Sequence, residues 1–394
     1  MRRLVAVGLS LVVVLCAGLW LGGHPMLLPG FIRGAVVDDD AEIVAEAIDK
    51  VHDTYYREIP RSTLADQSIT GLVDGLNDRF SNYFTPKQYA QFRETQSSEF
   101  SGIGVSVAQD KAGLRIVQVY DQSPAKRAGL QRGDIITGVG RVSLKGLDQT
   151  KASSLIKGPS GTDVELEITR KGAARRVKVT RATVSVPQVA SRIETVKGDK
   201  VGYVALAQFG SGAHAEVYAA LEKLQSQGAD RYVFDLRHNG GGLVSEAQLI
   251  ASAFLKDGPI VTTKGRSVPT RTLSATGDPV EATAPLVVLV DRDTASASEI
   301  VTGALQDRDR AEVVGTRTFG KGVFQEVVEL SNGGALDITA GQYFTPKGRN
   351  LGGRGVQTGT GIKPDVQASD DPATRPDEAL RAALKAVEAL GPGK

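Results

Sequence analysis

The chain has 394 residues, enough for two or three domains with separate hydrophobic cores. Apolar residues make up 41% and charged residues 23%, as in ordinary soluble globular proteins. The net charge of +2 comes without a long basic run, which argues against nucleic acid as a partner.

Cysteine and histidine usage argues against metal or disulfide chemistry. The single cysteine, Cys16, lies in the N-terminal apolar run, so an internal disulfide and a paired-thiol metal site are excluded. The four histidines, His24, His52, His214 and His238, are scattered without ligand spacing. We therefore expect no metal and no cofactor.

Residues 1–30 have the pattern of a membrane anchor. Arg2 and Arg3 precede an uncharged stretch that begins at Leu4, and apolar residues continue to Leu28. This length can span a bilayer, and the basic residues favour an N-in orientation. A cleaved signal peptide starts in the same way, but no clear small-x-small cleavage site follows. We expect an uncleaved anchor, with a cleaved signal as the alternative, and a chain exported to the extracellular or periplasmic side of the cell envelope.

The segment 38–98 is predicted to be helical. Apolar residues recur at helical spacing over 43–51 and again over 69–76. Aromatic residues cluster between 80 and 92, and we interpret them as core packing without chemistry.

The segment 99–184 changes to short strands. A turn formed by Ser101, Gly102, Ile103 and Gly104 leads into an alternating strand. The further elements are predicted as a strand at 114–119, a short helix from Ser123, a helix at 147–156, and strands at 164–170 and 175–180. The whole series resembles a PDZ domain. The resemblance implies that a peptide's C-terminal carboxylate binds backbone N–H groups of residues 101–104, while the peptide adds as a strand to the domain's edge.

From residue 185 onward, strands alternate with helices, which predicts an α/β layer architecture. A buried strand at 232–236 runs into the sequence Arg-His-Asn-Gly-Gly-Gly at 237–242, and a helix follows at 245–255. This order makes a cradle of backbone N–H groups, and glycine allows a close approach. Because the Gly-Lys-Ser/Thr signature of a phosphate loop is absent, we interpret the cradle as an oxyanion hole. Residues 256–284 are predicted to form a hairpin at the rim of the site.

The stretch 286–325 carries the candidate nucleophile. An apolar strand is followed by Ala-Ser-Ala-Ser-Glu at 295–299, a helix to about 307, and Lys321 between two glycines. A serine needs a base within reach, and a lysine can act as one only if burial lowers its pKa enough to leave it neutral. In a strand, Lys321, Val323 and Gln325 would share one face, so that Gln325 could hold the amine. Taken alone, Ser296 with Glu299 would instead be read as a helix capping box.

Three motifs in this order after the PDZ segment decide between these interpretations. They are Asp-Leu-Arg-x-Asn-Gly-Gly-Gly at 235–242, the 295–299 run, and Gly-x-Arg-x-Phe-Gly-Lys-Gly-x-x-Gln at 315–325. Over about 42–365 the chain resembles the carboxyl-terminal processing proteases (tail-specific proteases, S41 serine peptidases). The resemblance implies a multidomain chain with a PDZ domain at 99–184, a crotonase-like α/β peptidase core at 185–368 and a tail with a short helix at 369–394. It also implies that the PDZ domain gates the catalytic residues.

The site residues follow from the same resemblance. Ser296 would be the nucleophile, Lys321 the general base and Gln325 the residue that orients the lysine. The N–H groups of Gly241 and Ala297 would form the oxyanion hole, with Gly240 as a substitute for Gly241. Three departures from the family pattern stand out: Asp293-Thr294 replaces a usual Gly-Ser, Gly240 replaces a frequent proline, and the loop 351–361 is longer. Asp293 would place a carboxylate near the nucleophile.

We therefore expect an exported, membrane-anchored serine endopeptidase that recognises the C-terminal tails of protein substrates. An adaptor protein or a homo-oligomer stays open. One alternative is a PDZ scaffold with an inactive peptidase fold, but Ser296, Lys321 and Gln325 are all present. Another is a crotonase-like acyl-CoA enzyme, against which the PDZ segment and the export segment argue.

Overall fold

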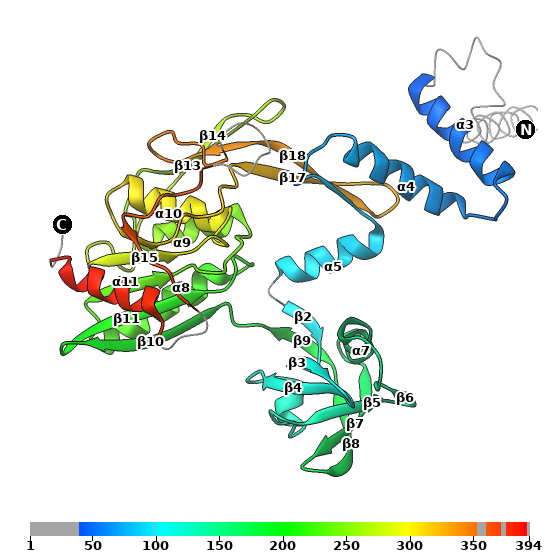
Figure 1. The fold of residues 1–394 in the computed structure, drawn as a ribbon, viewed down its shortest axis with the longest axis horizontal. Helices are drawn as coiled ribbons and strands as arrows, with labels where there is room; N and C mark the ends of the chain where they lie inside the picture. The colour runs from blue at the N-terminus through cyan, green and yellow to red at the C-terminus, as the bar shows by residue number, and fades with distance from the viewer. Residues whose placement is uncertain (1–38, 98, 353–359, 372–375, 392–394) are drawn as a thin grey trace, which may run out of the picture. The chain divides into compact units, whose positions relative to one another are not determined.

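The computed structural model describes residues 39–97, 99–352, 360–371 and 376–391 (Figure 1). The chain divides into two compact units, the first ending at Asn77 and the second beginning at Asp78. The expected anchor at 1–30 lies outside the described residues. Within the described residues, no helix combines the length and the apolar character needed to cross a membrane.

In the first unit, two helices pack against each other. They are α3 (Asp39–Thr54) and α4 (Arg61–Asp74). Leu64 and Val73 are buried, whereas Ile43 and Leu72 remain exposed. The helical spacing of the apolar residues explains both helices, although few of these side chains are covered within this unit.

The second unit contains the expected series of short strands. Its sheet has the order β3-β4-β5-β7-β8, with β6 beside β5, and all its strand pairs are antiparallel. Inward residues of alternating strands, such as Ile116, Ile136 and Leu166, are fully buried in one core. The elements are β3 (Val105–Asp110), β4 (Gly113–Val119), α6 (Pro124–Arg127), β5 (Ile135–Val139), β6 (Val142–Ser143), α7 (Gln149–Ile156), β7 (Asp163–Arg170) and β8 (Ala173–Thr180). The pair β2 (Glu99–Gly102) and β9 (Ala182–Ser185) brings together the two ends of this segment.

The largest core belongs to a six-stranded sheet with the order β10-β11-β12-β15-β16-β19. Only β10 and β11 are antiparallel to each other, and the remaining neighbours are parallel. Strand β15 is apolar throughout because both faces of the sheet are covered. The strands are β10 (Val189–Val196), β11 (Asp199–Leu206), β12 (Arg231–Asp235), β15 (Leu286–Val290), β16 (Glu312–Gly315) and β19 (Val366–Gln367).

Helices cover this sheet on both faces (Figure 1). Val288 and Val290 pack with α8 (Ala213–Ser226), α9 (Val244–Ser252) and α10 (Ala297–Asp307) on one face. Val287 and Leu289, the alternate residues of the same strand, pack with α11 (Glu378–Ala389) on the other. The parallel order puts the carboxyl ends of β12 and β15 side by side, where a binding site is expected in an open α/β sheet.

A separate five-stranded sheet contacts α9 and α10 of this core. Its order is β1-β18-β13-β14, and β17 pairs with β18. The predicted hairpin at 256–284 contains the antiparallel pair β13 (Pro259–Gly265) and β14 (Arg271–Ser274). Strand β1 (Asn82–Phe84) lies within the segment predicted to be helical and pairs with β18 (Ala335–Phe344), whereas α5 (Pro86–Gln96) follows it. The other strand is β17 (Val323–Glu329).

Candidate active site

Ser296 lies between strand and helix, immediately before α10 begins at Ala297. Its backbone angles are φ 58° and ψ −117°, a region that residues with a side chain rarely occupy. Such a conformation costs about 1–3 kcal/mol and persists only where surrounding contacts impose it. This strained turn sets the hydroxyl at the mouth of the helix, where the charge of the helix dipole is positive.

The Ser296 hydroxyl pairs with a tyrosine that the sequence analysis did not single out. Its Oγ lies 3.1 Å from the hydroxyl oxygen of Tyr343 on β18. Burial raises the pKa of Tyr343, so this phenol keeps its proton at neutral pH. Tyr343 sits at an inward position of a strand pattern, and such a pattern does not distinguish it from a core residue.

Lys321 and Gln325 come together as predicted, but not as members of one strand. The Lys321 ammonium donates to Gln325 Oε1 at 2.7 Å. Strand β17 begins only at Val323, and its register shifts between Phe324 and Gln325. A bulge of this kind can redirect a side chain, and Gln325 Oε1 accepts from Lys321 in the preceding loop. Lys321 therefore lies before the strand, and the alternation that would put it on one face with Gln325 does not apply to it.

Opposing effects act on the pKa of Lys321. Burial lowers it, and the negative charges of Asp337, Asp78 and Glu299 raise it, with burial the largest effect. The Phe80 ring also lies 5.1 Å from the ammonium nitrogen, which favours the charged form. The sequence predicts core packing alone for the aromatic cluster at 80–92, but Phe80 of this cluster contacts the candidate base.

Glu299 binds the backbone of both candidate catalytic residues. Its Oε2 accepts the N–H groups of Ser296 at 3.0 Å and of Lys321 at 2.9 Å. Its Oε1 accepts from the Gly320 N–H at 2.8 Å and from the Thr318 hydroxyl at 2.6 Å. Burial raises the pKa of this carboxyl, although these four hydrogen bonds act in the opposite direction. The capping glutamate recognised in the sequence thus also fastens the lysine loop to the start of α10.

The predicted oxyanion donors differ in their present hydrogen bonds. The Ala297 N–H has no partner among the described residues, as expected at the first turn of a helix. The Gly241 N–H donates to Asn239 Oδ1 at 2.9 Å, whereas the Gly240 N–H is unpaired within the same described set. Gly241 has φ +103°, and a Cβ there would lie 2.8 Å from the Cβ of Ser296, so only glycine fits this approach.

The glycine-bearing turn of the PDZ segment opens onto a groove. Gly104 has φ +81°, and the N–H groups of Ile103 and Gly104 find no acceptor in the described part of the chain. Ser101 is directed elsewhere, since its hydroxyl donates to the Gly158 carbonyl at 2.7 Å. The groove measures about 600 Å³ and is lined by residues of the turn, β3 and α7, such as Ile103, Val107 and Ile156. Residues outside the PDZ segment, Glu94 of α5 and Gln188 and Gln208, also line it.

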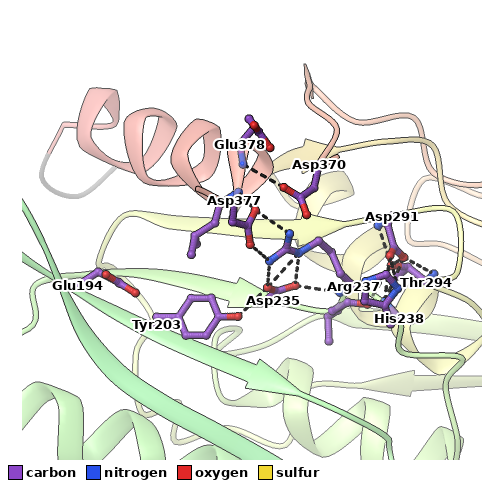
Figure 2. A network of polar contacts seen from close by, with 12 residues as sticks. Glu194, Tyr203, Asp235, Arg237, His238, Asp291, Thr294, Asp370, Asp377 and Glu378 are labelled. Atoms are coloured by element: carbon purple, nitrogen blue, oxygen red, sulfur yellow. Dashed lines mark hydrogen bonds and ion pairs between the residues drawn. The ribbon is translucent and has the colours of Figure 1, made fainter. Parts of the chain in front are cut away.

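A network of charged side chains surrounds Arg237, the first residue of the glycine-rich loop 237–242 (Figure 2). The Arg237 guanidinium donates to Asp235 and to Asp377, in each case with a shortest distance below 3 Å. Burial alone would lower the pKa of Arg237, but these two carboxylates raise it. The Tyr203 hydroxyl donates to Asp235 Oδ2 at 2.7 Å.

Figure 2 also shows His238 beside Asp291, a neighbour that the spacing of the histidines did not indicate. The Asp291 carboxylate accepts hydrogen bonds from the N–H groups of His238 and Thr294, so its oxygens already have backbone partners. Asp293, expected near the nucleophile, is 61% exposed and its carboxylate lies 3.3 Å from His238 Nδ1. His238, Asp291 and Asp293 therefore connect the glycine-rich loop to the loop after β15. We assign no metal to these three residues.

Comparison with known proteins agrees with this architecture. The model of peptidase family S41 matches residues 200–368, and a PDZ domain model matches residues 115–170. A carboxyl-terminal-processing protease of Picosynechococcus sp. is 37% identical, over 78% of this chain and 74% of its own length. A carboxy-terminal-processing protease of Bartonella bacilliformis is 35% identical, over 79% of this chain and 71% of its own.

Two solved structures share this fold. The photosystem II D1 C-terminal processing protease is 30% identical, with a TM-score of 0.50, covering 89% of this chain and 97% of that one. A putative S41 protease from Bacteroides fragilis shares the fold at 19% identity, with a TM-score of 0.52, covering 86% and 92%. None of these matches supports the scaffold or the acyl-CoA alternative. The chain belongs to the carboxyl-terminal-processing proteases of peptidase family S41, and it is a serine peptidase with a PDZ domain.

Proposed function

We propose that Ser296 is the nucleophile of this peptidase, that Lys321 is its general base and that Gln325 orients the lysine. The observation that carries the proposal is the Glu299 carboxylate, whose single oxygen Oε2 accepts the backbone N–H groups of both Ser296 and Lys321. This shared acceptor holds the two residues next to each other, although they belong to different elements. The burial that lowers the pKa of Lys321 supports its role as a base.

The reaction would proceed through an acyl-enzyme. Neutral Lys321 removes the proton of the Ser296 hydroxyl as Oγ attacks the scissile carbonyl carbon. The resulting ammonium gives that proton to the departing amine as the peptide C–N bond breaks. Water then attacks the ester, Lys321 accepts a proton from it, and the proton returns to Ser296 Oγ as the new carboxyl product leaves.

Oxyanion stabilisation would come from backbone N–H groups around the serine. We assign one donor to Ala297, whose N–H is free in the described chain. The second donor comes from the Gly240–Gly241 turn: Gly240 offers a free N–H in this conformation, and Gly241 offers one when Asn239 releases it. Removing one such donor typically costs about 10²–10³ in kcat.

A rearrangement is needed before catalysis. In the described conformation, the Ser296 hydroxyl pairs with Tyr343, the Lys321 ammonium pairs with Gln325, and no hydrogen bond joins the serine to the lysine among the described residues. Rotation of the serine side chain away from Tyr343 would bring its proton to the amine. We interpret the present arrangement as a resting state.

Substrate selection would rest on the PDZ domain. We propose that the unpaired N–H groups of Ile103 and Gly104 bind the carboxylate of a substrate's C-terminal tail.

We further propose domain limits at 99–184 and 185–368. We also propose that residues 1–30 direct export of the chain, which the uncharged stretch after Arg3 supports.

The proposal can be tested by cleavage of an unstructured protein with an apolar C-terminus. The purified full chain would be compared with Ser296→Ala and Lys321→Ala, and with the exposed-residue controls Ser226→Ala and Lys347→Ala. We expect loss of activity by about 10³-fold or more in the first pair, since residues that act as one unit each remove most of the rate. The control pair should cleave at the parent rate.

Two results would contradict the assignment. Cleavage that survives both Ser296→Ala and Lys321→Ala would mean that another nucleophile acts. Covalent labelling by a serine-reactive fluorophosphonate that persists in Ser296→Ala would lead to the same conclusion, independently of the substrate chosen.

A further inference from the structure

A polar residue on β18 holds Gln325 from the side opposite Lys321. Gln325 Nε2 donates to the hydroxyl oxygen of Thr339 at 3.1 Å, and the two residues face each other across β17 and β18. The Thr339 hydroxyl also bonds the Asp78 carboxylate, which can only accept, so the Thr339 oxygen is left to accept from the amide nitrogen of Gln325. With the nitrogen bound to Thr339, the oxygen necessarily faces the Lys321 ammonium.

Thr339 is itself held by a turn from a distant part of the chain. The Thr339 N–H donates to Ser81 Oγ at 3.0 Å, and the Ser81 hydroxyl donates to Asp78 Oδ2 at 2.6 Å. The Phe80 N–H donates to Asp78 Oδ1 at 3.0 Å, which closes the turn. Ser81 is only 7% exposed, so this contact is shielded from water.

The same turn also faces Lys321 directly. Phe80 presents its ring 5.1 Å from the ammonium nitrogen, and Arg79 stacks on that ring at 5.3 Å. Burial alone would raise the pKa of Asp78, but the hydroxyls of Ser81 and Thr339, the Phe80 N–H and the charge of Lys321 together lower it. The turn therefore contributes both an aromatic face and an ionised carboxylate to the surroundings of the lysine.

We infer that Thr339 is a positioning residue for the Lys321 base, acting through the Gln325 amide and itself fixed by the Asp78–Ser81 turn. The inference rests on the proposed role of Lys321. Without the Thr339 hydroxyl, the Gln325 amide loses the partner that selects its orientation. It can then present Nε2 to the lysine, where a donor faces a donor and the charged amine is disfavoured.

The decisive variant is Thr339→Val in the full chain, because valine keeps the shape and the β-branch but lacks the hydroxyl. We expect kcat to fall about tenfold, the equivalent of roughly 1.4 kcal/mol and of one lost hydrogen bond, with KM unchanged. Thr339→Ser, which keeps the hydroxyl, should return kcat to near the parent value. Thr272→Val on β14 is the matched control, since Thr272 is an exposed threonine of the same sheet.

The pH dependence of kcat distinguishes a positioning role of Thr339 from a general destabilisation of the sheet. Among the described residues, the charged groups that face Lys321 are Asp337, Asp78 and Glu299, with Arg79 beside the Phe80 ring. These groups are unchanged in Thr339→Val, so a flipped Gln325 should move the acid limb of kcat toward lower pH. Thr339→Ser should keep the parent limb.

The outcomes distinguish this inference from the proposed function. If Ser296→Ala and Lys321→Ala abolish cleavage but Thr339→Val keeps the parent kcat and acid limb, the inference is wrong and the dyad stands. If Lys321→Ala still cleaves, the dyad itself is wrong. Should Thr339→Val fail to fold, Thr339→Ala provides the same test, and a parent-like kcat and acid limb in that variant would overturn the inference equally.

Discussion

At the scale of single residues, the site depends on a strained serine that a buried carboxylate keeps in place. Ser296 adopts a positive φ, and its N–H donates to Glu299, which is fully buried. The same carboxylate accepts from the lysine loop, so serine and lysine share one structural anchor. The capping interpretation of Ser296 and its proposed catalytic role are therefore compatible, because the Glu299 carboxylate that caps α10 also binds the lysine loop.

Gly241 offers a test of how closely the glycine loop approaches the serine. Gly241→Ala would place a Cβ 2.8 Å from the Ser296 Cβ and 2.8 Å from the Ala295 carbonyl oxygen, at φ +103°. We expect the free energy of unfolding to fall by at least about 1–2 kcal/mol, the cost of a side chain in a left-handed conformation. Urea denaturation of the full chain measures it.

The neighbouring glycine provides the control. A Cβ at Gly240 would meet nothing within 4 Å, so Gly240→Ala should keep the parent stability. Equal unfolding free energies for the two variants would show that the loop does not approach the serine as described.

At the scale of elements, helix α11 joins the glycine loop through its N-cap. Asp377 accepts the Leu380 N–H at 2.8 Å and also binds Arg237, which lies two residues after the buried Asp235 at the end of β12 (Figure 2). Burial would raise the pKa of Asp377, but the Arg237 and Leu380 hydrogen bonds hold it below its ordinary value. A terminal helix thus contributes to the position of the loop.

The charge of Asp377 should make stability depend on pH. A carboxyl whose pKa is lowered by folding stabilises the folded chain above its unfolded pKa of about 3.9, and this contribution disappears as pH falls through the folded pKa. Asp377→Asn keeps the helix cap but removes the charge. We expect it to be less stable than the parent at pH 7, by no more than about 1 kcal/mol because Asp377 is partly exposed, with the difference vanishing in acid.

Thermal unfolding at pH 7 and below pH 4 measures this difference. Asp278→Asn, a change at an exposed loop residue, gives the background effect of losing one negative charge. A difference from the parent that persists unchanged in acid would mean that the ion pair with Arg237 is not its source.

At the scale of the whole molecule, the proposed tail-binding turn and the proposed catalytic residues belong to separate parts of the chain. The N–H groups of Ile103 and Gly104 have no acceptor in the part of the chain that the structure describes, while the serine and lysine belong to elements around the six-stranded sheet. The C-terminal carboxylate of a substrate should matter for binding even though the bond that is cut lies elsewhere.

A pair of peptides tests this division. We expect a substrate peptide with a C-terminal carboxamide to have a KM about tenfold higher than the same peptide with a free carboxylate. Hydrogen bonds to a charged group contribute about 1.5–3 kcal/mol, and every 1.4 kcal/mol is tenfold in affinity. Acetylation of the peptide's N-terminus is the control and should leave KM unchanged. Equal KM values for carboxamide and carboxylate would exclude carboxylate recognition.

The sequence by itself determined the family, the order of the parts and the candidate residues. Period-2 and period-3.6 patterns are local, so most strands and helices of the second unit could be placed from neighbouring residues alone. The motifs at 235–242, 295–299 and 315–325 each depend on residues adjacent in the chain, so Ser296, Lys321 and Gln325 could be named before their geometry was known. Local pattern was insufficient at 82–84, where three residues within a helical segment pair with β18.

Only the tertiary structure decided what surrounds those residues. Thr339 and Ser81 are 258 positions apart, and Ser296 and Tyr343 are 47 apart, so no local pattern links them. Phe80 and Tyr343 carry the same apolar signature as core residues, because an aromatic ring packs in either place. The present pairing of Ser296 with Tyr343 rather than Lys321 likewise depends on which side chains the packed sheets bring within hydrogen-bond distance, a property of contacts rather than of composition or spacing.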